Sequence, residues 1–353
     1  MRFLCLSWIP ATRHEHRFVT LSSQCNRVLR SRYHHSALVC CEQRPVALAR
    51  PGRHVFPECG GKPSEAVLRP TRRASSLPIS MLNTWKVADT SVRIPGTCLR
   101  VEAFPLFQDN YSYVLLDESQ HGPSRVIVAV DPADPDTFLE QLHARLAVRQ
   151  PTHVLTTHKH WDHAGGNSEL ARRFPGLVIY GSATDEIPAC TVPVHDGDEF
   201  RIAQSRLQVK VLATPCHTRG HVCYYVRDTE APRDAPGLVF TGDTLFIGGC
   251  GRFFEGTGAH MLQAMQKLKA LPPETYVFCG HEYTVANLAF ALTVEPNNES
   301  IRNKLKEAER LRAENKATIP STVGGEQQWN VFLRAADAQW MTELRERKNR
   351  FRG

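Results

Sequence analysis

The sequence predicts an α+β fold in which two β-sheets are flanked by helices, followed by a segment made of helices alone. Short apolar runs of strand length are mixed with amphipathic helical stretches as far as residue 282, and the connections between them are short. This mixed order suits two helix-covered sheets better than a doubly wound parallel sheet, in which strands and helices alternate regularly. From Tyr283 onwards only helical patterns remain.

The strands are predicted from apolar and β-branched runs, beginning with the alternating residues 98–104. After the turn at residues 131–135, Phe138, Leu142 and Leu146 recur at helical spacing and predict a helix. The remaining strands are expected at 111–116, 126–130, 153–156, 178–180, 207–213, 222–226, 238–241 and 276–279. The remaining helices are expected at 259–271, 287–294, 300–314 and in the basic stretch that ends the chain.

Residues 1–80 differ in composition from the rest of the chain. They carry a net charge of +9, whereas the remaining residues carry −2. An Arg-rich, Ser-rich and acid-poor stretch without periodicity is typical of an organelle-targeting presequence, so we expect a targeting leader and a mitochondrial (matrix) location. A leader without a targeting role, a secretory signal and a two-part signal to a plastid-type organelle stay open. An internal start at Met81 would give a cytoplasmic form.

The composition also argues against several classes of protein. The body after the leader is nearly neutral, so we expect no nucleic-acid partner. The chain has no run of eighteen apolar residues, so we expect no membrane partner. Eleven Cys residues without a CxxC pair favour free thiols over a disulfide scaffold. We expect a monomer.

A dense group of metal-binding residue types lies at positions 158–163. His158, His160, Asp162 and His163 place three imidazoles and a carboxylate within six residues, and these groups suit Zn²⁺, Fe or Mn. In an extended chain His158 and His160 point the same way. Asp162 and His163 converge only if the chain turns, which the glycines of 164–166 favour. The extended part, with His158 and His160, would then bind one metal ion, and the turn, with Asp162 and His163, would bind a second.

Three later strands are each followed by a single polar residue near a glycine. These residues are His217, Asp243 and His281. Each is a weak signal alone, but the three reinforce one another because they follow the histidine motif in order. The sequence therefore predicts a metal centre built at the ends of strands.

The motifs THKHWDH, HTRGH, TGD and GHE together resemble the series of the metallo-β-lactamase superfamily. The stretches 214–221 (TPCHTRGH), 249–256 (GCGRFFEG) and 279–284 (CGHEYT) resemble glyoxalase II, the hydroxyacylglutathione hydrolase family, in particular. The resemblance covers residue 99 to the end. It implies an αββα sandwich as the catalytic domain over 99–282 and a helical substrate-binding domain over 283–353.

The resemblance also implies the ligand set. One ion would be held by His158, His160 and His217, the other by Asp162, His163 and His281, and Asp243 would bridge them. Asp162 and Asp243 are accordingly expected to be catalytic, and His221 is expected to support the site without binding metal. We expect two divalent ions per chain, Zn first, although the ligand set also accepts Fe or Mn.

The implied reaction is hydrolysis of S-2-hydroxyacylglutathione, such as S-D-lactoylglutathione, to D-lactate and glutathione in methylglyoxal detoxification. Two ions about 3.5–4 Å apart share an oxygen and lower the pKa of bound water to about 7, which provides hydroxide to attack the thioester. The residues implied to bind glutathione are Arg252, Phe254, Tyr283, Arg345 and Lys348. Arg252 stands where Lys is common and Phe254 where Tyr is often found, so we expect altered thiol binding without loss of hydrolysis.

Two other interpretations stay open. A persulfide dioxygenase of the same fold has a similar GCGR loop but uses a single iron. A weakly active, partner-binding member of the fold shares the HKHWDH run, the Arg in the loop and the Phe two residues on. The complete ligand set, which includes His163 and His281, together with the Arg345/Lys348 pair, favours the hydrolase.

Overall fold

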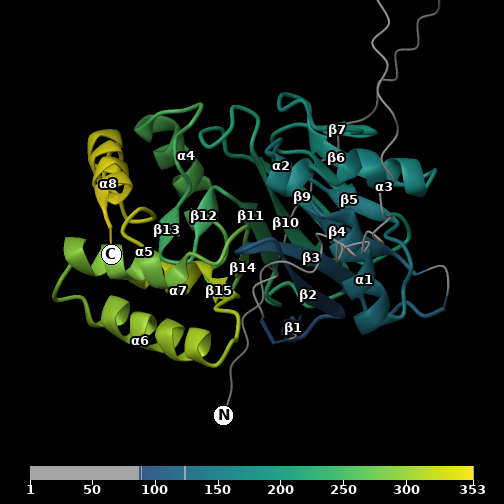
Figure 1. Cartoon of the computed structure of the whole chain (residues 1–353), viewed down its shortest axis with the longest axis horizontal. Coiled ribbons are helices and arrows are strands. Elements are labelled where there is room, and N and C mark those ends of the chain that lie inside the picture. Colours follow the sequence, from purple (N-terminus) through teal and green to yellow (C-terminus); the bar gives the residue numbers. More distant parts are fainter. Residues whose placement is uncertain (1–86, 89, 123–124, 353) are drawn as a thin grey trace, which may run out of the picture. The chain divides into compact units, whose positions relative to one another are not determined.

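The computed structural model describes residues 87–88, 90–122 and 125–352 (Figure 1). All the described residues belong to one compact unit of the chain. The predicted leader, residues 1–80, therefore lies outside the described residues. Within the described part, no helix combines the length and the apolar character needed to cross a membrane.

Two β-sheets form the centre of this unit. The first has seven strands in chain order, antiparallel from β1 to β4 and parallel from β4 to β7. Its strands are β1 Thr90–Arg93, β2 Leu99–Leu106, β3 Asn110–Asp117, β4 Ile127–Val130, β5 His153–Leu155, β6 Val178–Ser182 and β7 Val192–Val194. The second has six strands in the order β15-β14-β11-β10-β9-β8, and β12 and β13 form a separate ribbon. These strands are β8 Glu199–Arg201, β9 Leu207–Ala213, β10 Val222–Asp228, β11 Leu238–Gly242, β12 Leu245–Phe246, β13 Gly249–Cys250, β14 Tyr276–Cys279 and β15 Ser321–Thr322.

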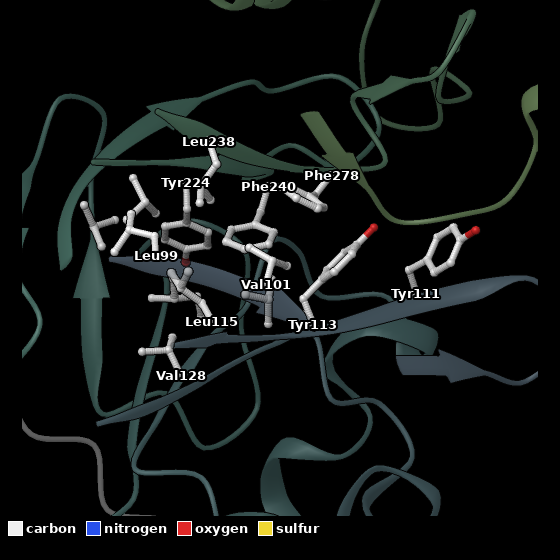
Figure 2. Close-up of a cluster of buried hydrophobic side chains, with 14 of the residues drawn as sticks. Leu99, Val101, Tyr111, Tyr113, Leu115, Val128, Tyr224, Leu238, Phe240 and Phe278 are labelled. Carbon is white, nitrogen blue, oxygen red and sulfur yellow. The ribbon is translucent and has the colours of Figure 1, made fainter. Parts of the chain in front are cut away.

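The main core lies between the two sheets. Val101, Tyr113 and Leu115 of the first sheet meet Tyr224 and Phe240 of the second, and Figure 2 shows these side chains interdigitating. β3 is buried along its whole length, because its alternate side chains face the other sheet on one side and helices on the other. A strand covered on both faces appears in the sequence as a continuous apolar run, which explains why β3 and β4 were predictable.

Helices cover the two outer faces and complete the αββα arrangement. The helices are α1 Pro135–Leu146, α2 Trp161–Ala164, α3 Asn167–Arg173, α4 Gly258–Lys269, α5 Thr284–Val294, α6 Glu299–Ala313, α7 Val323–Trp329 and α8 Ala338–Arg350. α1 and α3 pack on the β1–β7 sheet, whereas α4 to α8 gather beside the other sheet (Figure 1). α1 begins as predicted, because Asp134 caps its N-terminus and Pro135 occupies its first position.

The α+β fold predicted from the sequence is confirmed, but several short elements were missed. The first strand within the described residues is β1 at Thr90–Arg93, which precedes the first expected strand at residues 98–104. β1 and β8 are edge strands of three or four residues with alternating or mostly exposed side chains, so they give too short a pattern to detect. The boundary between the catalytic and helical domains at 282/283 stays a prediction.

Candidate metal centre and active site

The seven predicted ligand residues come together at one edge of the sandwich. Each follows the carboxyl end of a strand or lies in the short helix after it, so the backbone of the sheets fixes its position. The residues are His158 and His160 after β5, Asp162 and His163 in α2, His217 after β9, Asp243 after β11 and His281 after β14. The turn predicted at Asp162 and His163 is therefore the helix α2.

The glycines after this turn matter through their lack of a side chain. Gly165 and Gly166 have φ values of −60° and −79°, which any residue adopts, so the turn does not depend on the backbone freedom of glycine. A Cβ atom on Gly165 would lie 2.2 Å from the Trp161 carbonyl oxygen, and one on Gly166 would lie 2.0 Å from that of Pro132. The missing side chains let the chain after α2 pack directly against residues 132–133, which follow β4.

The side-chain nitrogens and oxygens converge as two sets. In the first set, His160 Nδ1 lies 3.0 Å from His158 Nε2 and 3.0 Å from His217 Nε2. In the second set, His163 Nε2 lies 3.2 Å from His281 Nε2 and 3.8 Å from Asp162 Oδ2. In each set, atoms that can bind a metal lie within 4.8 Å of one another.

Asp243 lies between the two sets and faces both. Its Oδ2 is 3.2 Å from His217 Nε2, whereas its Oδ1 is 3.3 Å from His163 Nε2 and 3.4 Å from His281 Nε2. Oδ1 is buried and has no hydrogen-bond partner within the described part of the chain. A buried carboxylate oxygen without a donor is costly, and a bound cation would satisfy it.

Asp131 fixes two of the histidines from outside the two sets. His163 Nδ1 lies 2.9 Å from Asp131 Oδ2. Thr157 Oγ1 donates to the same oxygen at 2.6 Å and lies 3.0 Å from His158 Nδ1. With a metal bound, both histidines would keep their proton on Nδ1 and direct the Nε2 lone pair inwards, which is the tautomer that binds a metal. Asp131 has a φ of +48°, uncommon for a residue other than glycine.

Other groups orient the remaining ligands. His281 Nδ1 lies 2.8 Å from Asp109 Oδ1, and His217 Nδ1 lies 3.0 Å from the Arg252 carbonyl oxygen. Asn110 Nδ2 donates to Asp162 Oδ2 at 3.1 Å. His221 Nε2 accepts the backbone N–H of Asp243 at 3.1 Å, so it supports Asp243 instead of belonging to either set. The sequence analysis did not identify Asp109, Asn110 or Asp131, although Asp131 follows β4 just as the ligands follow their strands.

The electrostatics of this centre favour a cation. Burial lowers the pKa of His158 and of His217. Burial also opposes protonation of His163 and His281, but Asp243 with Asp131 and Asp109 outweighs it, so the pKa of His163 is raised and that of His281 rises to about 9. A carboxylate that draws positive charge onto its neighbours equally favours a metal ion. Five imidazoles and two carboxylates suit divalent ions, so the residues fit a metal pair.

A pocket of ≈ 740 Å³ opens over this centre. It is lined by His160, Asp162, His217, Asp243 and His281. The same pocket is lined by the five residues predicted to bind substrate, which are Arg252, Phe254, Tyr283, Arg345 and Lys348. The structure therefore brings the predicted metal and substrate residues to one site, although they span nearly 200 positions of the chain.

Arg345 and Lys348 of α8 form the basic wall of the pocket. Arg345 is only 7% exposed, and its guanidinium donates to the Cys250 carbonyl oxygen at 2.9 Å, which ties α8 to the pocket loop. Lys348 Nζ donates to the Ala286 carbonyl oxygen at 2.6 Å and lies 5.4 Å from the Phe290 ring. Burial, with a smaller contribution from Arg345, lowers the pKa of Lys348 to about 8. The wall is therefore cationic and partly removed from water.

Aromatic side chains form the mouth of the pocket. Trp161, Phe254 and Tyr283 are the exposed large hydrophobic residues of the described chain, and all three line the pocket. The Phe254 ring lies 5.1 Å from the His217 ring, and Tyr283 stacks on His281 at 4.8 Å. Trp161 was not singled out from the sequence, because a single aromatic between ligands does not reveal its exposure.

The C-terminal helices hold the loop that carries Arg252 and Phe254. The buried Glu326 accepts the backbone N–H of Gly248 at 2.9 Å. Asn330 Nδ2 donates to the carbonyl oxygens of Phe246 at 3.1 Å and Gly249 at 3.0 Å. The helical segment thus supplies cations to the pocket and also shapes its loop.

Two family models match the chain side by side. Residues 125–281 match the metallo-beta-lactamase superfamily. Residues 282–351 match the model described as the C-terminus of hydroxyacylglutathione hydrolase. The first match contains all seven ligand positions, and the second contains Tyr283, Arg345 and Lys348.

Three curated proteins are similar to this chain. A protein of Arabidopsis thaliana named cytoplasmic hydroxyacylglutathione hydrolase is 43% identical over 268 residues, covering 72% of this chain and 100% of that protein. A hydroxyacylglutathione hydrolase-like protein of Gallus gallus is 46% identical over 240 residues, covering 68% of this chain and 81% of that protein. A hydroxyacylglutathione hydrolase of a Synechococcus strain is 41% identical over 267 residues, covering 72% of this chain and 100% of that protein.

Proposed function

The chain belongs to the hydroxyacylglutathione hydrolase family of the metallo-β-lactamase superfamily, and we propose that it hydrolyses S-2-hydroxyacylglutathione, with S-D-lactoylglutathione as its substrate. The products are D-lactate and glutathione. The observation that carries this proposal is the single pocket in which the two histidine-containing sets, bridged by Asp243, face Arg345 and Lys348. A metal pair alone would fit many hydrolases, but the basic wall adds the recognition of an anionic thiol.

The geometry supports a role in metal binding for each of the seven ligands. We propose that His158, His160 and His217 hold one ion, that Asp162, His163 and His281 hold the other, and that Asp243 bridges them. These ligands and their spacing suit Zn²⁺, which is the ion we propose, with Fe or Mn as substitutes. When bound, two such ions supply a nucleophile from water near neutral pH and stabilise the charge that develops on the carbonyl oxygen.

Residues around the metal ligands hold these ligands in the orientation that hydrolysis requires. Asp131 and Asp109 keep the Nδ1 protons of His163 and His281 directed outwards, and Asn110 holds the Asp162 carboxylate in place. Hydrolysis joins the water oxygen to the acyl carbon and breaks the carbon–sulfur bond. Because the pKa of a thiol is about 8.5, the sulfur leaves as a thiolate without an acid from the protein.

Recognition of glutathione is assigned to the other side of the pocket. We propose that Arg252, Arg345 and Lys348 bind the carboxylates of the tripeptide. Phe254 and Tyr283 contact its apolar parts and cover the histidines beneath them. A dioxygenase with a single iron would not require the second ligand set. That this set is complete therefore favours hydrolysis.

The experiment that tests the proposal is an assay of the full-length chain after chelation and reloading with Zn²⁺, Fe²⁺ or Mn²⁺ separately. We expect thiol release from S-D-lactoylglutathione by the reloaded enzyme and none by the metal-free form. Asp243→Ala should lose on the order of 10³-fold in kcat, since metal-ion catalysis contributes several kcal/mol. If the protein holds two ions per chain and still releases no thiol, the hydrolase assignment is wrong, and persulfide oxidation and partner binding become the reactions to test.

Three further properties of the chain are also proposals. We propose that residues 1–80 direct the protein to the mitochondrial matrix, because they are rich in Arg and poor in acids. We also propose that the enzyme is a monomer without nucleic-acid or membrane partners. Imaging of a fluorescent fusion with and without residues 1–80 tests the location, and light scattering tests the oligomeric state.

A further inference from the structure

Asp185 is a buried carboxylate beside the metal centre that neither lines the pocket nor belongs to either ligand set. It lies three residues after the end of β6 and is only 1% exposed. Its Oδ2 accepts the backbone N–H of Lys159 and the hydroxyl of Thr218, both at 2.8 Å. Its Oδ1 accepts the backbone N–H of Gly220 at 3.1 Å. A buried charge with three donors is held firmly, and none of the donors is itself charged.

The three donors lie on the two loops that carry the first histidine set. Lys159 stands between His158 and His160, and Thr218 directly follows His217. A Cβ atom on Gly220 would lie 2.5 Å from Asp185 Cβ, so the second loop packs tightly against Asp185. One carboxylate therefore joins two loops that are otherwise far apart in the sequence.

We propose that Asp185 is a positioning residue that fixes the distance between the His158/His160 loop and the His217 loop, and so sets the affinity of the first metal site. The inference rests on the ligand roles proposed above. Asp185 acts only through the loops, because its carboxylate contacts none of the imidazoles. The second set, Asp162, His163 and His281, has no hydrogen bond to Asp185 within the described chain, so we expect its affinity to depend far less on this residue.

A second carboxylate joins the same loops at the surface and sharpens the assignment. Glu255 pairs with Lys159 Nζ at 2.8 Å and accepts the backbone N–H of Arg219 at 2.7 Å. The paired side chains of Lys159 and Glu255 are 34% and 28% exposed. An exposed pair contributes little, whereas an unsatisfied buried group is costly, so the buried Asp185 carries most of the constraint.

The substitution that tests the proposal is Asp185→Asn in the full-length chain. An amide keeps the size but turns an NH₂ group towards donors, so at least one buried N–H or O–H loses its partner. The matched control is Asp117→Asn. Asp117 is buried and also accepts two backbone N–H groups and one hydroxyl, from Ser119 and Arg206. It lies at the end of β3 away from Asn110, roughly 20 Å along the strand.

The measurement is a competitive Zn²⁺ titration with a chelator, supported by Co²⁺ absorption spectra of each site. The wild type should bind two ions in two steps. His160→Ala removes a ligand of the first site, so the step that it weakens is the binding step of that site. We expect Asp185→Asn to weaken that step roughly 10–100-fold and to weaken the other step far less. Asp117→Asn should leave both steps unchanged even if it lowers the melting temperature as much.

Other outcomes would overturn the proposal in distinguishable ways. Unchanged affinities in Asp185→Asn, or equal losses in both Asn variants, would make Asp185 a residue of general stability. If Asp185→Asn does not fold, Thr218→Val replaces it as the test, because it removes the hydroxyl that donates to Asp185. Thr218→Ser keeps that hydroxyl and is the control. Equal Zn²⁺ affinities of the first site in these two variants would reject the proposal. A wild type that binds fewer than two ions, or a His160→Ala variant that retains both, would instead overturn the proposed ligand set and the inference with it.

Discussion

The two sides of the pocket differ in how far their side chains are buried and in how firmly other groups hold them. On the strand-end side, His158, His163 and Asp243 are nearly inaccessible, and side-chain or backbone groups fix each of them from behind. On the helical side, Phe254 is 61% exposed and Lys348 reaches the pocket on a long side chain. The first side holds a geometry that the reaction depends on, whereas the second offers charge and apolar surface to a flexible tripeptide. Variants on the first side should therefore change kcat, and variants on the second should change KM.

The strongest test of this division between kcat and KM is to alter a residue that supports the strand-end side but does not contact the substrate. Asp131→Asn replaces the acceptor that holds His163 Nδ1 and Thr157. We expect a fall of roughly 10–100-fold in kcat or in metal affinity, because such partners orient the ligands. KM should change less than threefold. Steady-state kinetics with parallel metal analysis checks this, and a rise in KM alone would show that the two sides are not separable.

The matching test on the helical side is Lys348→Met, which removes the charge and keeps the length of the side chain. A charge-assisted hydrogen bond contributes about 1.5–3 kcal/mol, so we expect KM to rise roughly tenfold or more while kcat stays within twofold. Glu343→Gln, a change at an exposed position of the same helix, is the control. A fall in kcat without a change in KM would place Lys348 in the chemical step.

The division between the two sides also reflects what a sequence reveals. The strand-end ligands could be predicted, because four of them lie within six residues and the others each follow a strand. Apart from His221, which the family resemblance indicated, their supporting residues could not be predicted, because their roles depend on contacts between distant segments. Asp185 meets Lys159 across 26 positions, and Glu326 meets Gly248 across 78. The α+β fold with two helix-flanked sheets follows from the pattern of strands, and the family resemblance implied the αββα sandwich, whereas short edge strands such as β8 are specified by pairing that no local pattern shows.

The pH dependence of substrate binding sharpens the comparison further. The pKa of Lys348 is lowered to about 8 in the free enzyme, chiefly by burial. Below pH 8 the side chain is charged and binds a carboxylate; above pH 8 it becomes neutral, so kcat/KM should fall as the pH rises through this value. Lys348→Arg stays charged over this range and should lack this fall. The ratio of the two kcat/KM profiles isolates Lys348 from the metal centre, and a constant ratio between pH 7 and 9.5 would refute the assignment.

The smallest expected effect comes from Phe254, which lies on the substrate-binding side of the pocket but close to two of the histidines. Its exposed ring lies 5.1 Å from His217 and 5.9 Å from His160, yet it lines the pocket with the substrate residues. Phe254→Tyr adds a hydroxyl at the mouth, where one net hydrogen bond of about 0.5–1.5 kcal/mol should lower KM by two- to tenfold. Metal affinity and kcat should stay unchanged, because the ring itself remains. If kcat or metal affinity changes instead, Phe254 acts mainly as a cover for the histidines, and Phe254→Ala should then reproduce that loss with a larger amplitude.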